Sequence, residues 1–326
     1  MINKKKVLFY GNCQLAVLSK MLQSQNPKFN EQYEVLKASD YKLPHVWLQE
    51  VGTVAPFMYA KHTKYGVATP ETIKAVERIT EDADIIIFQK FHEAKHANRP
   101  EELTTDYIYT KHNTCKKMIC IPSFWFSGYL TEALDDLVIP SIFKWLVDKK
   151  LNNKQILDWL KNESHPNISL LIEKNAKDSI EELYKREIEE TSTYENFVSI
   201  LDILSEYKEH LLCYCDNHPS KYYFEKMYSE IIKIIDSELF FDLTKENILL
   251  PGSDYFPRPL DFYWFNENFP NISNYDPKDY VERLDENFVY KQVSLVTAID
   301  TESHIFKNHI QKDLNILNKN ESTRAL

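Results

Sequence analysis

The chain has 326 residues, of which 43% are hydrophobic and 27% charged. This composition is enough for a folded core and roughly two domains, so disordered and fibrous classes are excluded. The 39 Lys and Arg residues against 49 Asp and Glu give a net charge of -10. A general attraction to nucleic acid or to an anionic membrane is therefore excluded, and any anion must be bound by a local arrangement of groups.

Short apolar runs alternate with helical patterns along the first part of the chain, as in a parallel α/β sheet. The series opens with an apolar run at 6–10, a turn at Gly11 and Asn12, and a helix expected over about 13–23. Another helix is expected from Pro70, because proline is favoured in the first helical turn. Continuous apolar runs are typical of a parallel sheet covered on both faces. The further strands expected in that sheet are 33–38, 84–88, 117–121 and 210–214.

The pattern becomes helical and highly charged after about residue 134. Helical spacing predicts an amphipathic helix whose apolar face holds Ile172, Ala176, Ile180, Leu183 and Ile188. A helix over 224–235 resumes the α/β pattern, and the aromatic-rich C-terminal part either caps the core irregularly or lines an acceptor site. The predicted parts are a first α/β portion at 1–133, a helical insertion at 134–204, a closing α/β unit at 205–240 and a C-terminal extension at 241–326.

The cysteines indicate a reducing compartment. They are odd in number and none has a CxxC spacing, so they are interpreted as reduced thiols of a cytoplasmic protein. The apolar run after the N-terminal lysines is too short for a secretion signal, and no apolar run approaches the roughly 18 residues of a membrane span. The cysteines are Cys13, Cys115, Cys120, Cys213 and Cys215.

The first candidate site is the sequence Gly11-Asn12-Cys13-Gln14, directly after the first predicted strand. The first N–H groups of the following helix would point at the carboxyl edge of the sheet, an arrangement that suits an oxyanion or a phosphate. A thiol in that position has its thiolate favoured, so Cys13 is a candidate nucleophile. Alternatively, Cys13 is a small buried residue or only shapes an anion-binding turn.

The second candidate site follows the predicted strand at 210–214. His218 would lie at the same sheet edge as the first turn, where it could act as general base or acid with Asp216 as an orienting carboxylate. Pro219 and Ser220 would then begin the next helix. The alternative is a turn at Asp216 with His218 as a capping or surface histidine.

The third candidate is a zinc-binding signature, in which His92, Glu93 and His96 match HExxH. Zinc would need both histidines on one face of a long helix and a third ligand downstream. The strand-like residues before His92 and the proline at Pro100 argue for a helix too short for this purpose. We therefore predict no metal, although His92 near a strand end can still line the pocket.

A nucleophile after the first strand, a polar residue after a middle strand and a late histidine resemble the layout of SGNH/GDSL hydrolases. Gly11-Asn12-Cys13 stands where that superfamily has Gly-Asp-Ser, and Gln89 stands near its third-block asparagine. The sequence departs from that pattern in two ways. The nucleophile is a cysteine and not a serine, and Asp216 lies two and not three residues before His218. Together with the segments 121–129 and 211–220, these features resemble the WcbI-type polysaccharide biosynthesis family over about residues 5–270.

That resemblance implies an SGNH-like three-layer α/β fold that binds coenzyme A and acetylates a sugar hydroxyl of a capsular polysaccharide. The catalytic residues would be Cys13 and His218 with Asp216. The implied cofactor-binding residues are Gly11, Asn12, Gln14, Gln89, Ser123, Gly128 and Tyr129.

In the expected mechanism, backbone N–H groups at 11–14 and the Gln89 side chain stabilise the oxyanion. Either His218 activates the sugar hydroxyl for direct attack, or Cys13 first takes the acetyl group. Lys90 is one of several lysines that could meet the phosphates of coenzyme A, although most lysines are simply solvated.

Two other functions remain open at this point. One is a carbohydrate esterase or deacetylase of the SGNH type, and the other is a non-catalytic sugar- or nucleotide-binding partner of a glycosyltransferase. The expected partners are a sugar or polysaccharide acceptor and the glycan assembly machinery, with no nucleic acid.

Overall fold

A computed structural model of the chain has an α/β fold built on a parallel sheet. It describes residues 4–43, 53–54, 69–90, 100–126, 128, 166–215, 218–239, 279–283 and 290–294. The strands of the sheet are β1 (Lys5–Tyr10), β2 (Tyr33–Val35), β3 (Thr53–Val54), β4 (Ile85–Gln89) and β5 (Lys117–Ile121). The strands predicted at 6–10, 84–88 and 117–121 are therefore confirmed, whereas the strand predicted at 33–38 ends at Val35 and a 3-10 turn begins at Ala38.

The sheet has the order β2-β1-β4-β5, with β3 also paired to β1, and every pairing is parallel. Phe9 of β1 is in register with Ile87 of β4, which in turn faces Ile119 of β5. The chain adds β2 on one side of β1 and then β4 and β5 on the other. The order of the strands reverses between β1 and β4, and such a switch point is where open α/β sheets bind ligands.

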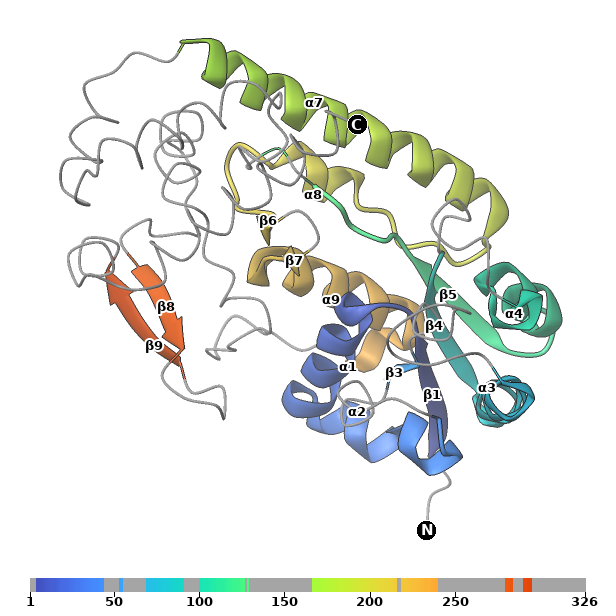
Figure 1. The fold of residues 1–326 in the computed structure, drawn as a ribbon. Helices are drawn as coiled ribbons and strands as arrows, with labels where there is room; N and C mark the ends of the chain where they lie inside the picture. The colour runs from blue at the N-terminus through green and yellow to red at the C-terminus, as the bar shows by residue number, and fades with distance from the viewer. Residues whose placement is uncertain are drawn as a thin grey trace, which may run out of the picture. The chain divides into compact units, whose positions relative to one another are not determined.

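Helices cover both faces of these strands, which gives the three layers. Figure 1 shows α1 (Cys13–Gln25) and α9 (Lys221–Ile235) on one side, and α3 (Pro70–Asp82) and α4 (Thr105–His112) on the other. Alternate strand residues such as Leu8, Phe88 and Cys120 belong to one buried cluster with α3 and α4. Their neighbours along each strand point to the α1 side, because side chains alternate across a strand.

Side-chain capping explains where several helices begin. The Asn12, Asn26, Thr69 and Thr104 side chains each accept a hydrogen bond from a backbone N–H in the first turn of the helix that follows. Asn26 precedes α2 (Pro27–Gln32), and its amide also donates to the Tyr228 hydroxyl and the Leu239 carbonyl, both at 2.9 Å. This buried amide thus fixes the junction of α1 and α2 against α9.

The predicted amphipathic helix is α7 (Pro166–Thr193), but its buried face differs from the expectation. Ala176 and Leu183 are buried as predicted, whereas Ile188 is 61% exposed. The positions that continue this face are Glu187 and Glu190, four and seven residues after Leu183, and both carboxylates are buried. The placement of Ile188 on the buried face was wrong, because Ile188 lies five residues after Leu183 and this spacing points its side chain away from that face.

The strand predicted at 210–214 does not extend the parallel sheet. Residues Cys213–Cys215 form β6, which pairs antiparallel with β7 (His218–Pro219). Only two residues separate these strands, and so short a connection joins antiparallel strands but never parallel ones. The other described elements are α8 (Leu201–Ser205), the antiparallel pair β8 (Asp279–Arg283) and β9 (Tyr290–Ser294), and single 3-10 turns at Ala38–Tyr41, Glu101–Leu103 and Ser237–Leu239.

The chain divides into two compact units. The first comprises Met1–Phe124, Leu183–Leu204 and Tyr223–Leu250, and the second comprises Trp125–Glu182, Ser205–Tyr222 and Pro251–Leu326. The first unit contains the parallel sheet, and α7 begins in the second unit and ends in the first. Among the described helices, none is long and apolar enough to cross a membrane. The predicted insertion boundaries at 134 and 204 stay a prediction.

Candidate functional site

The candidate site lies at the switch point between β1 and β4, within the first unit. The turn after β1 and the end of β4 meet there, because the Asn12 backbone N–H donates to Gln89 Oε1 at 3.1 Å. The segment after β5 joins them through Ser123 and Phe124, which contact the same turn. Three strand ends far apart in the sequence thus converge at the carboxyl edge of the sheet.

Asn12 is the residue on which the turn depends. Its backbone is extended, and its Oδ1 accepts from the Gln14 N–H at 2.8 Å, so it caps α1 at Cys13. Its carbonyl accepts from the N–H groups of Leu15 and Ala16. Its Nδ2 donates to the Ser123 hydroxyl at 3.4 Å. One side chain therefore both begins the helix and fixes the segment after β5.

Gln14 connects α1 to the same segment through a pair of hydrogen bonds. Its Nε2 donates to the Phe124 carbonyl at 2.7 Å, and its Oε1 accepts from the Phe124 N–H at 3.1 Å. The side-chain amide pairs with one backbone residue as a neighbouring strand would. Gln14 is 3% exposed, so this contact is made inside the protein.

Gln89 is fully buried, and its amide binds protein groups on every side. Its Nε2 donates to Gln14 Oε1 at 2.9 Å and to the Pro122 carbonyl at 3.2 Å, while its Oε1 accepts from Asn12. Both of its N–H groups are used by these contacts. A direct contact of the Gln89 amide with an oxyanion would require one of these hydrogen bonds to be given up, and the expected role stays a prediction.

Gly11 allows this close approach. A Cβ at Gly11 would lie 2.8 Å from Gln89 Oε1 and 2.3 Å from Leu15 Cδ1, well inside van der Waals contact. Glycine is required here by space, since any larger side chain would push the amide of Gln89 away from the turn.

Asn12 and Ser123 form the accessible rim of this arrangement. Both are half-buried, whereas Gln14 and Gln89 behind them are buried. Ser123 Oγ accepts from Asn12, so the serine proton can be donated to a different group. The rim therefore offers neutral hydrogen-bond donors beside the N-terminus of α1, which is a suitable environment for a carbonyl oxygen that becomes negative.

Four residues of the predicted site have no described side chain. Cys13 is the first residue of α1, as expected, and His218 lies in β7, but neither side chain is among those described. Asp216 and Tyr129 lie outside the described residues. Since β6 is not a strand of the parallel sheet, the argument that placed His218 at the same edge as Cys13 no longer holds. Their meeting stays a prediction.

Gly128, predicted as a cofactor-binding residue, has a packing role. A Cβ there would lie 2.4 Å from Phe126 Cζ and 2.7 Å from Ala176 Cα of α7. Glycine thus allows the chain to pass close to the backbone of this helix.

The zinc signature of His92, Glu93 and His96 lies outside the described residues. Where the chain is described, no three His, Cys, Asp or Glu residues gather as metal ligands.

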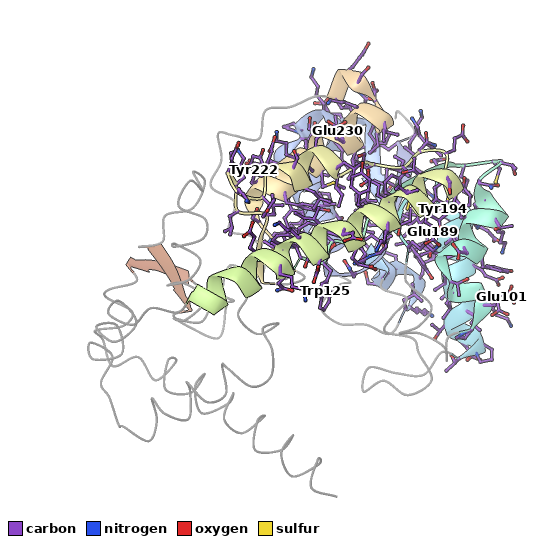
Figure 2. All side chains as sticks on the ribbon, turned by 90° about the horizontal axis from the view of Figure 1, so that it is seen from above. Glu101, Trp125, Glu189, Tyr194, Tyr222 and Glu230 are labelled. Carbon is purple, nitrogen blue, oxygen red and sulfur yellow. The ribbon has the colours of Figure 1, made fainter. Side chains whose placement is uncertain are left out.

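Next to Gln89, Lys90 stands among carboxylates on the other face of the sheet. Its Nζ lies 3.2 Å from Glu189 Oε1, and Asp106 and Glu190 also act on its charge. Burial lowers the pKa of Lys90, but these carboxylates outweigh burial and the net pKa is raised. We call Lys90, Asp106, Glu189 and Glu190 the Lys90 cluster; Figure 2 shows Glu189 and the nearby Tyr194 at the same end of α7.

The Lys90 cluster includes one deeply buried carboxyl group. Glu190 is 2% exposed, and burial raises its pKa to about 7 although Lys90 and Arg186 act in the opposite direction. Tyr194 donates a hydrogen bond to Asp106, and burial together with this contact raises the pKa of the phenol. A lysine surrounded by three acidic groups is a poor partner for phosphate, so the expected contact of Lys90 with coenzyme A does not fit.

Local patterns only partly reveal these two networks. The sequence shows Asn12 and Gln14 after the first strand, and Gln89 at the end of β4, only as isolated polar residues. Their mutual pairing was missed, because it joins positions 75 and 110 residues apart. The Lys90 cluster was missed because the face of α7 was assigned with Ile188 instead of Glu187 and Glu190.

Comparison with known proteins finds one similar solved structure. No family model matches the chain, and no curated protein matches it. One solved structure is similar, that of WcbI, described as a novel polysaccharide biosynthesis enzyme in its native form without a disulfide bond between coenzyme A and a cysteine. The two chains are 20% identical over 74% of each, with a TM-score of 0.49.

Proposed function

We propose that the chain is a coenzyme A-dependent acyltransferase that transfers an acetyl group to a sugar hydroxyl in surface polysaccharide biosynthesis. The observation that carries the proposal is the turn at the switch point, where an asparagine-capped helix begins at Cys13 beside the Ser123 hydroxyl. The acyl donor and the sugar class come from the motif resemblance. We place the reaction in the cytoplasm, together with the glycan assembly machinery.

The oxyanion donors can be assigned from the hydrogen bonds already in use. The Asn12 N–H donates to Gln89, and the Gln14 N–H donates to Asn12 Oδ1. We therefore assign the oxyanion contacts to the Cys13 N–H at the start of α1 and to the Ser123 hydroxyl proton. Such donors stabilise charge that develops in the transition state more than the neutral thioester, and this difference lowers the barrier.

Two routes lead from this site to the product. In the covalent route, the Cys13 thiolate attacks the thioester carbonyl, the bond to the coenzyme A sulfur breaks, and the released thiolate takes a proton. The sugar oxygen then attacks the acetyl-cysteine and gives its proton to His218, and the Cys13 thiolate is restored. In the direct route, His218 takes the proton of the sugar hydroxyl while the sugar oxygen attacks the thioester carbonyl. The bond to the coenzyme A sulfur breaks, the released thiolate takes the proton back from His218, and Cys13 only occupies the turn.

The described residues fit the acyl end of the donor better than its phosphates. The neutral rim of Asn12 and Ser123 suits a thioester carbonyl, whereas Lys90 is held by acidic neighbours. The phosphates would therefore be bound away from the Lys90 cluster.

Thermal unfolding with and without coenzyme A tests the proposal most directly. A ligand at 100 times its dissociation constant should add about 2.7 kcal/mol of stability. Ser123→Ala should weaken the response to acetyl-coenzyme A, while the exposed Ser39→Ala serves as a matched control. If coenzyme A does not stabilise the wild type, the proposal is rejected. Release of acetate without coenzyme A would favour a hydrolase instead.

The covalent route makes a separate prediction. Mass spectrometry after brief exposure to acetyl-coenzyme A should find an acetyl group on the peptide that contains Cys13. Activity of Cys13→Ala within about tenfold of wild type, or about 1.4 kcal/mol, would leave only the direct route.

A further inference from the structure

We infer that Gln14 and Gln89 are positioning residues, whose paired amides fix the distance between the Cys13 turn and the Ser123 segment. The inference rests on the proposed function, because it concerns the two donors assigned to one oxyanion. It assigns these glutamines no contact with the ligand, in contrast to the cofactor-binding role expected from the sequence.

The orientation of both amides is determined by backbone groups. The Asn12 N–H can only donate, so it must face Gln89 Oε1, and the Gln89 Nε2 then faces Gln14 Oε1 and the Pro122 carbonyl. The Phe124 N–H and carbonyl fix the amide of Gln14 in the same way. Neither amide can rotate by 180° without placing like groups against each other.

The hydrogen bonds of the network reach residues directly next to the two donors in the chain. Gln89 binds the N–H of Asn12, one residue before Cys13, and the carbonyl of Pro122, one residue before Ser123. Gln14 binds Phe124, one residue after Ser123. Donors of an oxyanion site must be held within a fraction of an ångström, and a buried neutral network does this without dependence on pH.

Replacement of one amide by a carboxyl group provides a specific test. A protonated carboxyl has one donor and one acceptor, which is what Gln14 uses toward Phe124 and Gln89. Gln14→Glu should therefore keep the contacts with Phe124 and Gln89 at low pH, and function should fall when the introduced carboxyl ionises and meets the Phe124 carbonyl. Gln89 uses two donors, so Gln89→Glu should be impaired at either pH.

The primary measurement is the alkylation rate of Cys13 by iodoacetamide, followed by mass spectrometry of its peptide, with the exposed Cys115 as internal reference. The ratio of Cys13 to Cys115 should fall at least fivefold in Gln89→Met at pH 8, because the thiolate at the helix N-terminus loses its fixed position. In Gln14→Glu the ratio should equal wild type within twofold at pH 6 and fall at least fivefold at pH 8.5. Gln23→Met, on the same helix outside the site, is the matched control.

An unchanged or increased ratio in Gln89→Met, and no pH dependence in Gln14→Glu, would overturn the inference and leave the glutamines with a structural role alone. If Gln89→Met does not fold, the two pH values of Gln14→Glu decide. The response of the wild type to coenzyme A is measured in parallel. If the alkylation pattern is as expected but coenzyme A does not stabilise the wild type, the proposed function is rejected and the positioning role is kept. If coenzyme A stabilises the wild type but the alkylation pattern is not found, only the positioning role is rejected.

Discussion

Gln89 and Lys90 are neighbours at the carboxyl end of β4, yet they belong to networks of opposite kind. Gln89 points to the α1 side and joins a buried network of neutral amides and backbone groups. Lys90 faces α7 and joins a cluster of carboxylates that includes a buried one. A neutral network keeps its geometry over a wide pH range, whereas a buried carboxyl near a lysine changes state near neutrality.

The comparison indicates which network serves which purpose. Positions that must not move are held by amides, whose hydrogen bonds require no charge to be removed from water. The Lys90 cluster instead joins the end of α7 to the end of β4 through the ion pair of Lys90 with Glu189.

The largest expected effect is that of Gln89→Leu. The substitution removes the hydrogen-bond partner of the Asn12 N–H and of the Pro122 carbonyl, while Gln14 Oε1 keeps the Phe124 N–H as a donor. Each of these two groups costs about 1–3 kcal/mol when it loses its partner, so we expect a loss of about 2–6 kcal/mol in the free energy of unfolding. Urea unfolding measures this loss. A change below about 1 kcal/mol would mean that the amide network is not rigid.

Glu190→Gln should remove a pH dependence of stability from the other network. The unfolded chain ionises this carboxyl near the ordinary pKa of 4.5, but the folded chain keeps the proton until about pH 7. The contribution of Glu190 to stability therefore falls as pH rises from about 4.5 to about 7, by at most about 3 kcal/mol.

Urea unfolding of wild type and Glu190→Gln at several pH values between 5 and 8 gives the difference that matters. The variant should gain stability relative to wild type toward pH 8. His112 acts in the opposite direction, because burial lowers its pKa and its contribution is lost as pH falls below about 6.5. The difference between the two proteins cancels that effect, and a difference constant with pH would contradict the prediction.

A smaller effect is expected from Gly11→Ala. The added Cβ would meet Leu15 Cδ1 at 2.3 Å and Gln89 Oε1 at 2.8 Å, so both must shift. Overpacking of this kind costs about 1–3 kcal/mol. We expect a loss of about 2 kcal/mol by urea unfolding together with weaker binding of coenzyme A. Full stability with normal binding would show that the turn adapts freely.

The smallest effect is expected from Glu189→Gln. Glu189 is 63% exposed, and its ion pair with Lys90 lies at the surface of the cluster. Such pairs contribute about 0.5 kcal/mol or less and are screened by salt. Unfolding at low and high salt should show almost no change, in contrast to Glu190→Gln one residue along. A loss above about 1 kcal/mol would mean that the whole cluster is coupled.

Much of the fold could be predicted from local patterns. Continuous apolar runs identified β1, β4 and β5, and the Gly11-Asn12 turn identified the start of α1. The strand at 210–214 was misplaced because a short apolar run does not reveal its pairing partner. The candidate site could be located from Asn12 and Cys13, but the direct role given to the Gln89 amide could not be judged without its neighbours.

The sequence by itself determined the strand, turn and helix around Asn12, because periodicity and capping act between residues close in the chain. Only the tertiary structure decided that the amides of Gln14 and Gln89 pair with each other, that Gln14 also pairs with Phe124, and that Glu190 is buried near Lys90. These contacts join segments 75 or more residues apart, where no local spacing relates the partners. Burial then sets their chemistry, since a polar group removed from water must find its partner within the fold.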